Sequence, residues 1–237
     1  MDPRSVDASR GAAWFGGGWR IFAKNPGMWL LLTIVLVVLV LVLGVIPLGG
    51  LAIALLAPVI GGGLLYGAAE LEAGRPLEIK HLWQGFKDPA RLTPLLGLGA
   101  VTLAAGALSL LIVAGFVGGT MEMMAGGGDP MLMPLDTRGL LALLLALTVQ
   151  LAATILIYFA VPLAMFRAVP AMAAMRSSVR ACARNVLPLF VFSLIYFFAA
   201  IVASVPFGLG WLVLLPWSIG MLYCSYVDIY PASSAGG

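Results

Sequence analysis

Few side chains in this sequence are suited to catalysis or metal binding, and none is arranged for either. Glu70 and Glu72 form a close carboxylate pair of the kind used in general acid–base chemistry. Arg75 follows them and favours a solvated ion-pair cluster instead. His81 is the only histidine, and the two cysteines lack the spacing of a zinc site or a disulfide framework. No nucleophile motif, P-loop or dinucleotide fingerprint is present. We therefore expect no enzymatic activity, metal or cofactor.

The composition indicates a chain surrounded by lipid. It is 62% hydrophobic and only 10% charged, with a mean hydropathy of +1.08, whereas soluble domains have about 25% charged residues. Thirteen basic and ten acidic residues are too few to cover a surface in water. The net charge of +3 does not indicate a nucleic-acid partner here, because the placement of the charges matters more than their sum. The first apolar run is longer than the core of a signal peptide and follows Asp2 and Asp7, so we expect it to be retained as a span.

Six apolar runs are long enough to cross a membrane as helices. They cover residues 28–46, 51–69, 92–117, 140–166, 187–205 and 211–227. The runs do not alternate between apolar and polar residues, which excludes a β-barrel pattern. Short links join the first two runs and the last two, so each pair is expected to form an antiparallel hairpin. The predicted fold class is therefore an all-α polytopic bundle, with a Gly- and Met-rich loop at 118–139 whose role the sequence does not indicate.

The basic residues predict the orientation. An even number of spans leaves both termini on one side, and every Lys and Arg except Arg138 falls on that side. Positive charge marks the cytoplasmic face of membrane proteins. We therefore expect a multi-pass protein of the bacterial inner membrane with both termini in the cytoplasm.

The chain shows signs of an internal repeat. Aligning its two ends matches Arg20 with Arg180, Lys24 with Arg184, Asn25 with Asn185, Pro47 with Pro206, Pro58 with Pro216 and Tyr66 with Tyr223. The middle of the chain shares only the entry motif "FKDP". We predict one membrane domain over 1–237, made of three tandem units at about 8–70, 76–167 and 168–230. Chance similarity between apolar segments is the alternative.

A short polar motif precedes each pair of spans. Asn25 and Asp88 are each followed by proline. Asn and Asp side chains cap helix N-termini, and proline is tolerated in the first turn. These positions are thus expected to end a surface helix and to start a spanning one.

The three surface helices are predicted to lie in the membrane interface, although packing on the bundle is the alternative. Their expected apolar faces are Phe15, Trp19 and Phe22 in the first, Ile79, Leu82, Trp83 and Phe86 in the second, and Met172, Met175 and Val179 in the third. The cations expected to contact anionic lipid headgroups are Arg20, Lys24, Lys80, Lys87, Arg176, Arg180 and Arg184.

Within the spans the notable residues are one amide and three prolines. Gln150 is predicted to make an interhelical hydrogen bond, with Thr148 and Thr154 as nearby candidates, or to contact a substrate. Pro58, Pro162 and Pro216 can kink their helices, either to shape packing or to line a binding site. The spans carry ionisable side chains only at their ends, which argues against ion-coupled transport.

The stretches "GWRIFAKNPGMWLLL", "PLGGLAIALLAPVIGGGLLYG" and "ARNVLPLFVFSLIYFF" resemble a family of six-span inner-membrane proteins of proteobacteria. More distantly, the module is similar to the membrane domain of some glycerophosphodiester phosphodiesterases. No phosphodiesterase catalytic domain accompanies it here, so that activity is not implied. The resemblance implies an inner-membrane location and supplies no active residues.

Two functional hypotheses follow. The first is a non-enzymatic scaffold or accessory subunit that engages lipid and a membrane-protein partner or a second copy of itself. The second is a transporter or lipid-handling protein for a small or amphiphilic substrate. A cavity near Gln150, Pro58 and Pro216 would favour the second hypothesis, whereas a filled core with an exposed apolar flank would favour the first.

Overall fold

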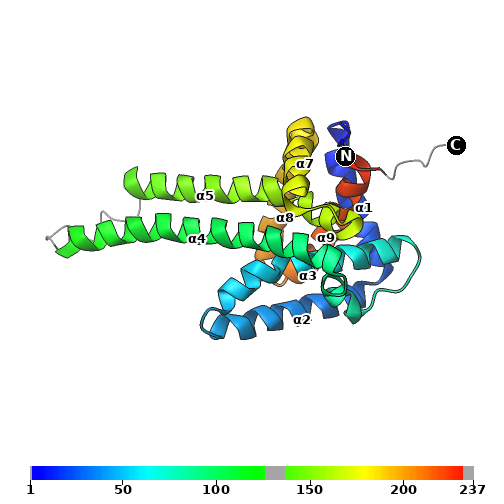
Figure 1. Cartoon of the computed structure of the whole chain (residues 1–237), viewed down its shortest axis with the longest axis horizontal. Helices are drawn as coiled ribbons and strands as arrows, with labels where there is room; N and C mark the ends of the chain where they lie inside the picture. Colours follow the sequence, from blue (N-terminus) through cyan, green and yellow to red (C-terminus); the bar gives the residue numbers. More distant parts are fainter. Residues whose placement is uncertain (1, 126–136, 232–237) are drawn as a thin grey trace.

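The computed structural model describes residues 2–125 and 137–231, and within these ranges the chain is helical without strands (Figure 1). The elements are α1 (Ser9–Lys24), α2 (Pro26–Val45), α3 (Gly49–Glu72), the 3-10 helix η1 (Ile79–Phe86), α4 (Pro89–Ala125), α5 (Thr137–Ile157), α6 (Ala160–Arg167), α7 (Ala171–Arg184), α8 (Val186–Ser204) and α9 (Trp211–Ile229). Six segments of the described chain are long and apolar enough to span a membrane: α2, α3, the first part of α4, α5 with α6, α8 and α9. The predicted helical membrane bundle is confirmed.

Local capping starts two of the spans as expected. The Asn25 side chain accepts a hydrogen bond from the Met28 N–H at 3.2 Å, and Pro26 is the first residue of α2. The Asp88 side chain accepts one from the Ala90 N–H at 2.9 Å just before α4. Asn185 differs, because its side chain makes no such bond to α8.

The fourth span is broken, which corrects the prediction of one continuous helix over 140–166. α5 ends at Ile157 and α6 begins at Ala160. Pro162 has no N–H to bond the carbonyl of Tyr158, four residues earlier. Two backbone groups at the break bond to Ser178 of α7 instead of to each other. The Ser178 hydroxyl donates to the Ile155 carbonyl at 2.7 Å and accepts from the Phe159 N–H at 3.1 Å.

The middle hairpin is longer than predicted. α4 continues to Ala125, into the segment expected to be a loop, and α5 begins at Thr137. The rest of the predicted loop lies outside the described residues. In Figure 1 the α4–α5 hairpin extends past the turn between α2 and α3.

The surface helices pack on hairpins in a ring. η1 packs on α3, α7 on α5 and α6, and α1 on α8 and α9. With the chain divided into the three predicted units, each surface helix contacts the hairpin of the preceding unit, and the first unit closes onto the third. The division into repeats itself stays a prediction.

The apolar faces of these helices are only partly available to lipid, which corrects the predicted faces. In α1, Phe15 and Phe22 are buried against the bundle while Trp19 is 46% exposed. η1 is a 3-10 helix rather than an α-helix, so Leu82 is buried whereas Trp83 is exposed. The remaining sets divide in the same way: Ile79, Met172 and Val179 are exposed, Phe86 is half-buried, and Met175 is buried.

The two ends of the described chain meet at one end of the bundle. The Arg4 N–H donates to the Ile229 carbonyl at 3.0 Å. α1 and α7 lie at this end in Figure 1, opposite the tip of the α4–α5 hairpin. We call it the basic end, because the predicted lipid-contacting cations lie on its elements.

Candidate functional site

Four of the seven predicted lipid-contacting cations already form ion pairs. Lys24 pairs with Glu72 and Lys80 with Glu78, each at 2.8 Å. Arg180 and Arg184 approach the Asp2 carboxylate at 3.6 and 4.0 Å. These pairs are exposed, so each contributes little stability and leaves the side chain able to exchange partners.

Arg20, Lys87 and Arg176 are exposed and form no ion pair with any described residue. They come from α1, from the end of η1 and from α7, so all three surface helices contribute one. Their contact with anionic headgroups stays a prediction.

A half-buried carboxylate that the sequence analysis did not select ties α1 to α9. Asp228 accepts a hydrogen bond from the Trp14 indole at 2.8 Å and one from Arg10 at 2.6 Å, and Arg4 also contacts it. Such a group gives no local signal, because its partners lie more than two hundred residues away in the sequence.

The role of Asn185 was also missed, although the sequence alignment matched this residue with Asn25. Its side chain is fully buried, accepts from the Val6 N–H at 2.9 Å and donates to the carbonyls of Arg4 and Ala181 at 3.0 Å. It therefore clamps the N-terminal segment onto the end of α7. Its position matches that of Asn25 in the predicted repeat. The Asn25 side chain caps α2, however, whereas the Asn185 side chain bonds the N-terminal segment.

The acidic and histidine side chains at the basic end are held by neighbouring groups. The Arg75 guanidinium donates to Glu70 at 2.7 Å, and Glu72 is held by Lys24, so the carboxylate pair is an ion-pair cluster. Burial lowers the pKa of His81, and its Nδ1 accepts from the Glu78 N–H at 3.2 Å. No group of three or more potential metal ligands occurs in the described residues.

A cavity of about 360 Å³ lies between α3, α4, α5, α6 and α9, and it opens to the outside of the bundle, where its lining residues Gln150 and Thr154 are exposed. We call it the central cavity. It brings together Pro58 and Gln150, two of the residues that the sequence analysis selected. The returning spans of all three hairpins line it, so it lies where the predicted units meet.

The polar groups of the central cavity are few and uncharged. The hydroxyls of Thr102 and Thr154 donate to carbonyls in their own helices, at 3.2 and 2.8 Å. Thr148 likewise donates within α5 to Leu144 at 2.7 Å, so neither predicted threonine bonds Gln150 across helices. The Tyr158 hydroxyl is buried near Ser225 without a hydrogen bond of ordinary geometry. The Gln150 amide and the Tyr158 hydroxyl are thus the polar groups of the wall available to an occupant.

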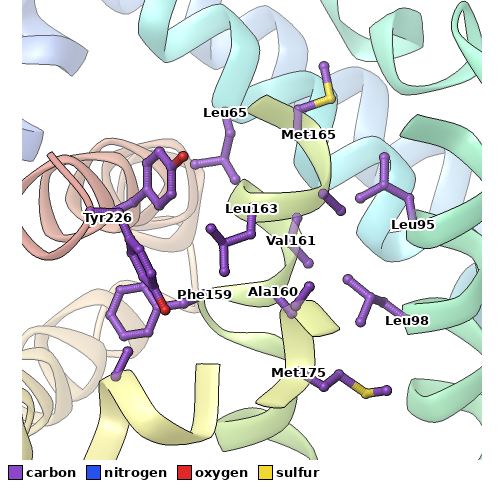
Figure 2. Close-up of a cluster of buried hydrophobic side chains, with 14 of the residues drawn as sticks. Leu65, Leu95, Leu98, Phe159, Ala160, Val161, Leu163, Met165, Met175 and Tyr226 are labelled. Atoms are coloured by element: carbon purple, nitrogen blue, oxygen red, sulfur yellow. The ribbon is translucent and has the colours of Figure 1, made fainter. Parts of the chain in front are cut away.

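A buried apolar cluster adjoins the central cavity. Figure 2 shows Leu65 of α3, Leu163 of α6 and Tyr226 of α9 converging from three sides. Leu65 also belongs to the wall of the cavity. The cluster and the cavity therefore share a wall.

A second space of about 350 Å³ lies between α2, α3 and α9. We call it the α2–α9 groove. Trp29 and Pro216 line it, and Ile219 lines both it and the central cavity. Pro162 lines neither space, since it is buried at the break between α5 and α6.

Comparison with known proteins identifies one relevant relative. A probable inner membrane protein of Burkholderia thailandensis is 30% identical over 247 residues, which cover 95% of this chain and 91% of that protein. No family model matches, so the distant likeness to phosphodiesterase membrane domains remains a resemblance only. No solved structure matches either. The extent of the match, together with the six candidate spans, shows that the chain belongs to the family of this bacterial inner membrane protein.

Proposed function

We propose that this protein binds an amphiphilic molecule in the central cavity and so handles lipid-like compounds in the inner membrane without catalysing a reaction. The observation that carries the proposal is the cavity itself, which combines Pro58 and Gln150 at the meeting point of three hairpins. A cavity of this size falls in the range of small-molecule sites, which are mostly apolar with a few placed polar groups.

The wall chemistry defines the ligand class. Apart from one amide and three hydroxyls, the walls are apolar, and no acidic or basic side chain lines them. The Gln150 amide offers both donors and an acceptor. The fitting ligand therefore has an apolar body and an uncharged polar end that both donates and accepts, as in a monoacylglycerol.

The proposal is tested by filling the cavity at Gly61. Gly61 lines the central cavity, and a Cβ added there meets no atom within 4 Å. Gly61→Leu therefore fills the space without an initial clash. Gly50→Leu is the matched control, because Gly50 lies in the same helix, is exposed and is equally unobstructed.

The assay is photolabelling of purified protein in nanodiscs by a monoacylglycerol with a diazirine in its acyl chain. Wild type and Gly50→Leu should be labelled at cavity residues, and unlabelled monoacylglycerol should compete. Gly61→Leu should lose this labelling. Equal labelling of cavity residues in Gly61→Leu and wild type would refute the proposal.

The amide is tested separately. Gln150→Leu keeps the approximate volume and removes the hydrogen bonds, each worth about 0.5–1.5 kcal/mol net. We expect monoacylglycerol to bind Gln150→Leu roughly tenfold more weakly, measured by competition against the photolabel.

A scaffold or accessory role is a second candidate, supported by the apolar flanks of α5 and α8. The large exposed side chains there include Leu141, Leu145, Phe190, Phe197 and Val202. In this role they would contact a membrane-protein partner or a second copy. Affinity purification in mild detergent with mass spectrometry tests it, and recovery of the monomer alone would count against it.

A further inference from the structure

The Trp29 indole is an unusual buried group in this protein. Its side chain is 1% exposed, and its N–H has no hydrogen-bond partner among the described residues. By contrast, the indoles of Trp14, Trp211 and Trp217 donate to Asp228, Ser204 and the Phe15 carbonyl at 2.8 to 3.1 Å. Buried donors are normally paired, so the Trp29 N–H points to a missing acceptor.

Trp29 lines the α2–α9 groove, and no other residue of the groove accepts a hydrogen bond from its indole. Thr33 and Ser218 also line the groove, and their hydroxyls donate to the carbonyls of Trp29 and Leu215 at 2.9 and 2.6 Å. The remaining lining is aliphatic or proline. The indole is thus left without an acceptor, which an occupant of the groove can supply.

The length of the groove fits one lipid leaflet. Its α2 wall extends from Trp29 to Leu41. At 1.5 Å per residue this is about 18 Å, slightly more than half of the roughly 30 Å thickness of the hydrocarbon layer. The groove thus suits one acyl chain lying along the bundle.

The Trp29 end of the groove adjoins the basic end. Trp29 packs in one buried cluster with Ile21 and Phe22 of α1. Arg20, next to Ile21 in sequence, is exposed and forms no ion pair with a described residue. Tryptophan at the interface and a nearby cation match the depth of lipid ester groups and phosphates.

We propose that the α2–α9 groove binds one acyl chain of an anionic glycerophospholipid, with the Trp29 N–H donating to an ester carbonyl and Arg20 attracting the phosphate. This site is separate from the ligand proposed for the central cavity and does not depend on it. It assigns a role to Pro216, which together with Leu215 and Ile219 forms the α9 wall of the groove.

The experiment compares two lipids that differ only in whether they have ester carbonyls to accept the hydrogen bond from Trp29. Phosphatidylglycerol and its diether analogue, which lacks ester carbonyls, are titrated onto delipidated protein and counted by native mass spectrometry. Wild type should bind the ester lipid about tenfold more tightly, the effect of one hydrogen bond in a buried site. Trp29→Phe should bind both lipids equally, at the affinity of the diether.

Trp19→Phe is the matched control, because Trp19 is exposed at the same end and should leave the preference unchanged. Val37→Trp fills the groove while keeping the Trp29 N–H, and it should lose both lipids even if Trp29→Phe fails to fold. Gly61→Leu should keep the ester preference, which separates this site from the central cavity. Equal binding of the two lipids by wild type, or bound lipid in Val37→Trp, would overturn the proposal.

Discussion

The packing of α1 against α9 can be tested with two neighbouring glycines. A Cβ at Gly18 would lie 2.7 Å from the backbone nitrogen of Met221 and 3.0 Å from the Trp217 ring. A Cβ at Gly16, two residues earlier, meets nothing within 4 Å. Both glycines lie inside α1, so the two Gly→Ala changes differ in their surroundings rather than in their helix.

The magnitude follows from two opposing terms. Alanine is about 0.8–1.0 kcal/mol more favourable than glycine in a helix, and both variants gain this term. Overpacking at Gly18 costs about 1–3 kcal/mol, because the obstructing nitrogen belongs to backbone and the helices must separate. The variants should therefore differ by about 1–3 kcal/mol. For a chain of this size that is about 2–12 °C in Tm.

The measurement is thermal unfolding of both variants and wild type, purified in the same detergent and followed by intrinsic fluorescence. Gly16→Ala should melt above wild type, and Gly18→Ala should melt below Gly16→Ala by the stated interval. If Gly18→Ala is stabilised as much as Gly16→Ala, α1 is not packed on α9 and lies free at the membrane surface, as the sequence pattern alone allows.

Three further predictions concern pH, thiol reactivity and orientation. Because burial lowers the pKa of His81, the unfolded chain binds a proton more readily, so this contribution to stability is present above about pH 6.5 and is lost as the pH falls. The Tm of wild type should therefore drop more between pH 7 and pH 5 than that of His81→Asn. Burial raises the pKa of the Cys182 thiol to about 11, so maleimide should label it slowly at pH 8 in a Cys224→Ser variant and rapidly after unfolding in SDS; fast labelling of the folded protein would contradict the burial. A fluorescent protein fused at the C-terminus should be bright and alkaline phosphatase fused there should be inactive, since the basic end is expected in the cytoplasm; the opposite pattern would reverse the orientation.

Features that depend on neighbours in sequence were predictable. The caps at Asn25 and Asp88 join atoms two or three residues apart, so residue type and spacing suffice to locate them. The six spans follow from the length and apolarity of each run. Pro162 was identified as a possible kink, although the full break became visible only with Ser178, a residue on another helix that stabilises it.

The candidate site was predicted in part. Gln150, Pro58 and Pro216 were selected as unusual residues within spans, and the structure places the first two in one cavity and the third in the groove. Trp29 was not selected, because an indole near a span end is an ordinary anchor in sequence. Its lack of a partner is a property of the folded chain.

The amino-acid sequence by itself determined that this chain contains six apolar membrane-spanning segments, and that its basic residues gather at one end of them. Only the tertiary structure decided which apolar faces contact protein and which remain open. The physical reason is that lipid tails are as apolar as leucine, so the hydrophobic effect does not distinguish a helix face covered by lipid from one covered by another helix. Shape complementarity makes that choice, as at Gly18 against Met221, and it depends on residues that are distant in the sequence.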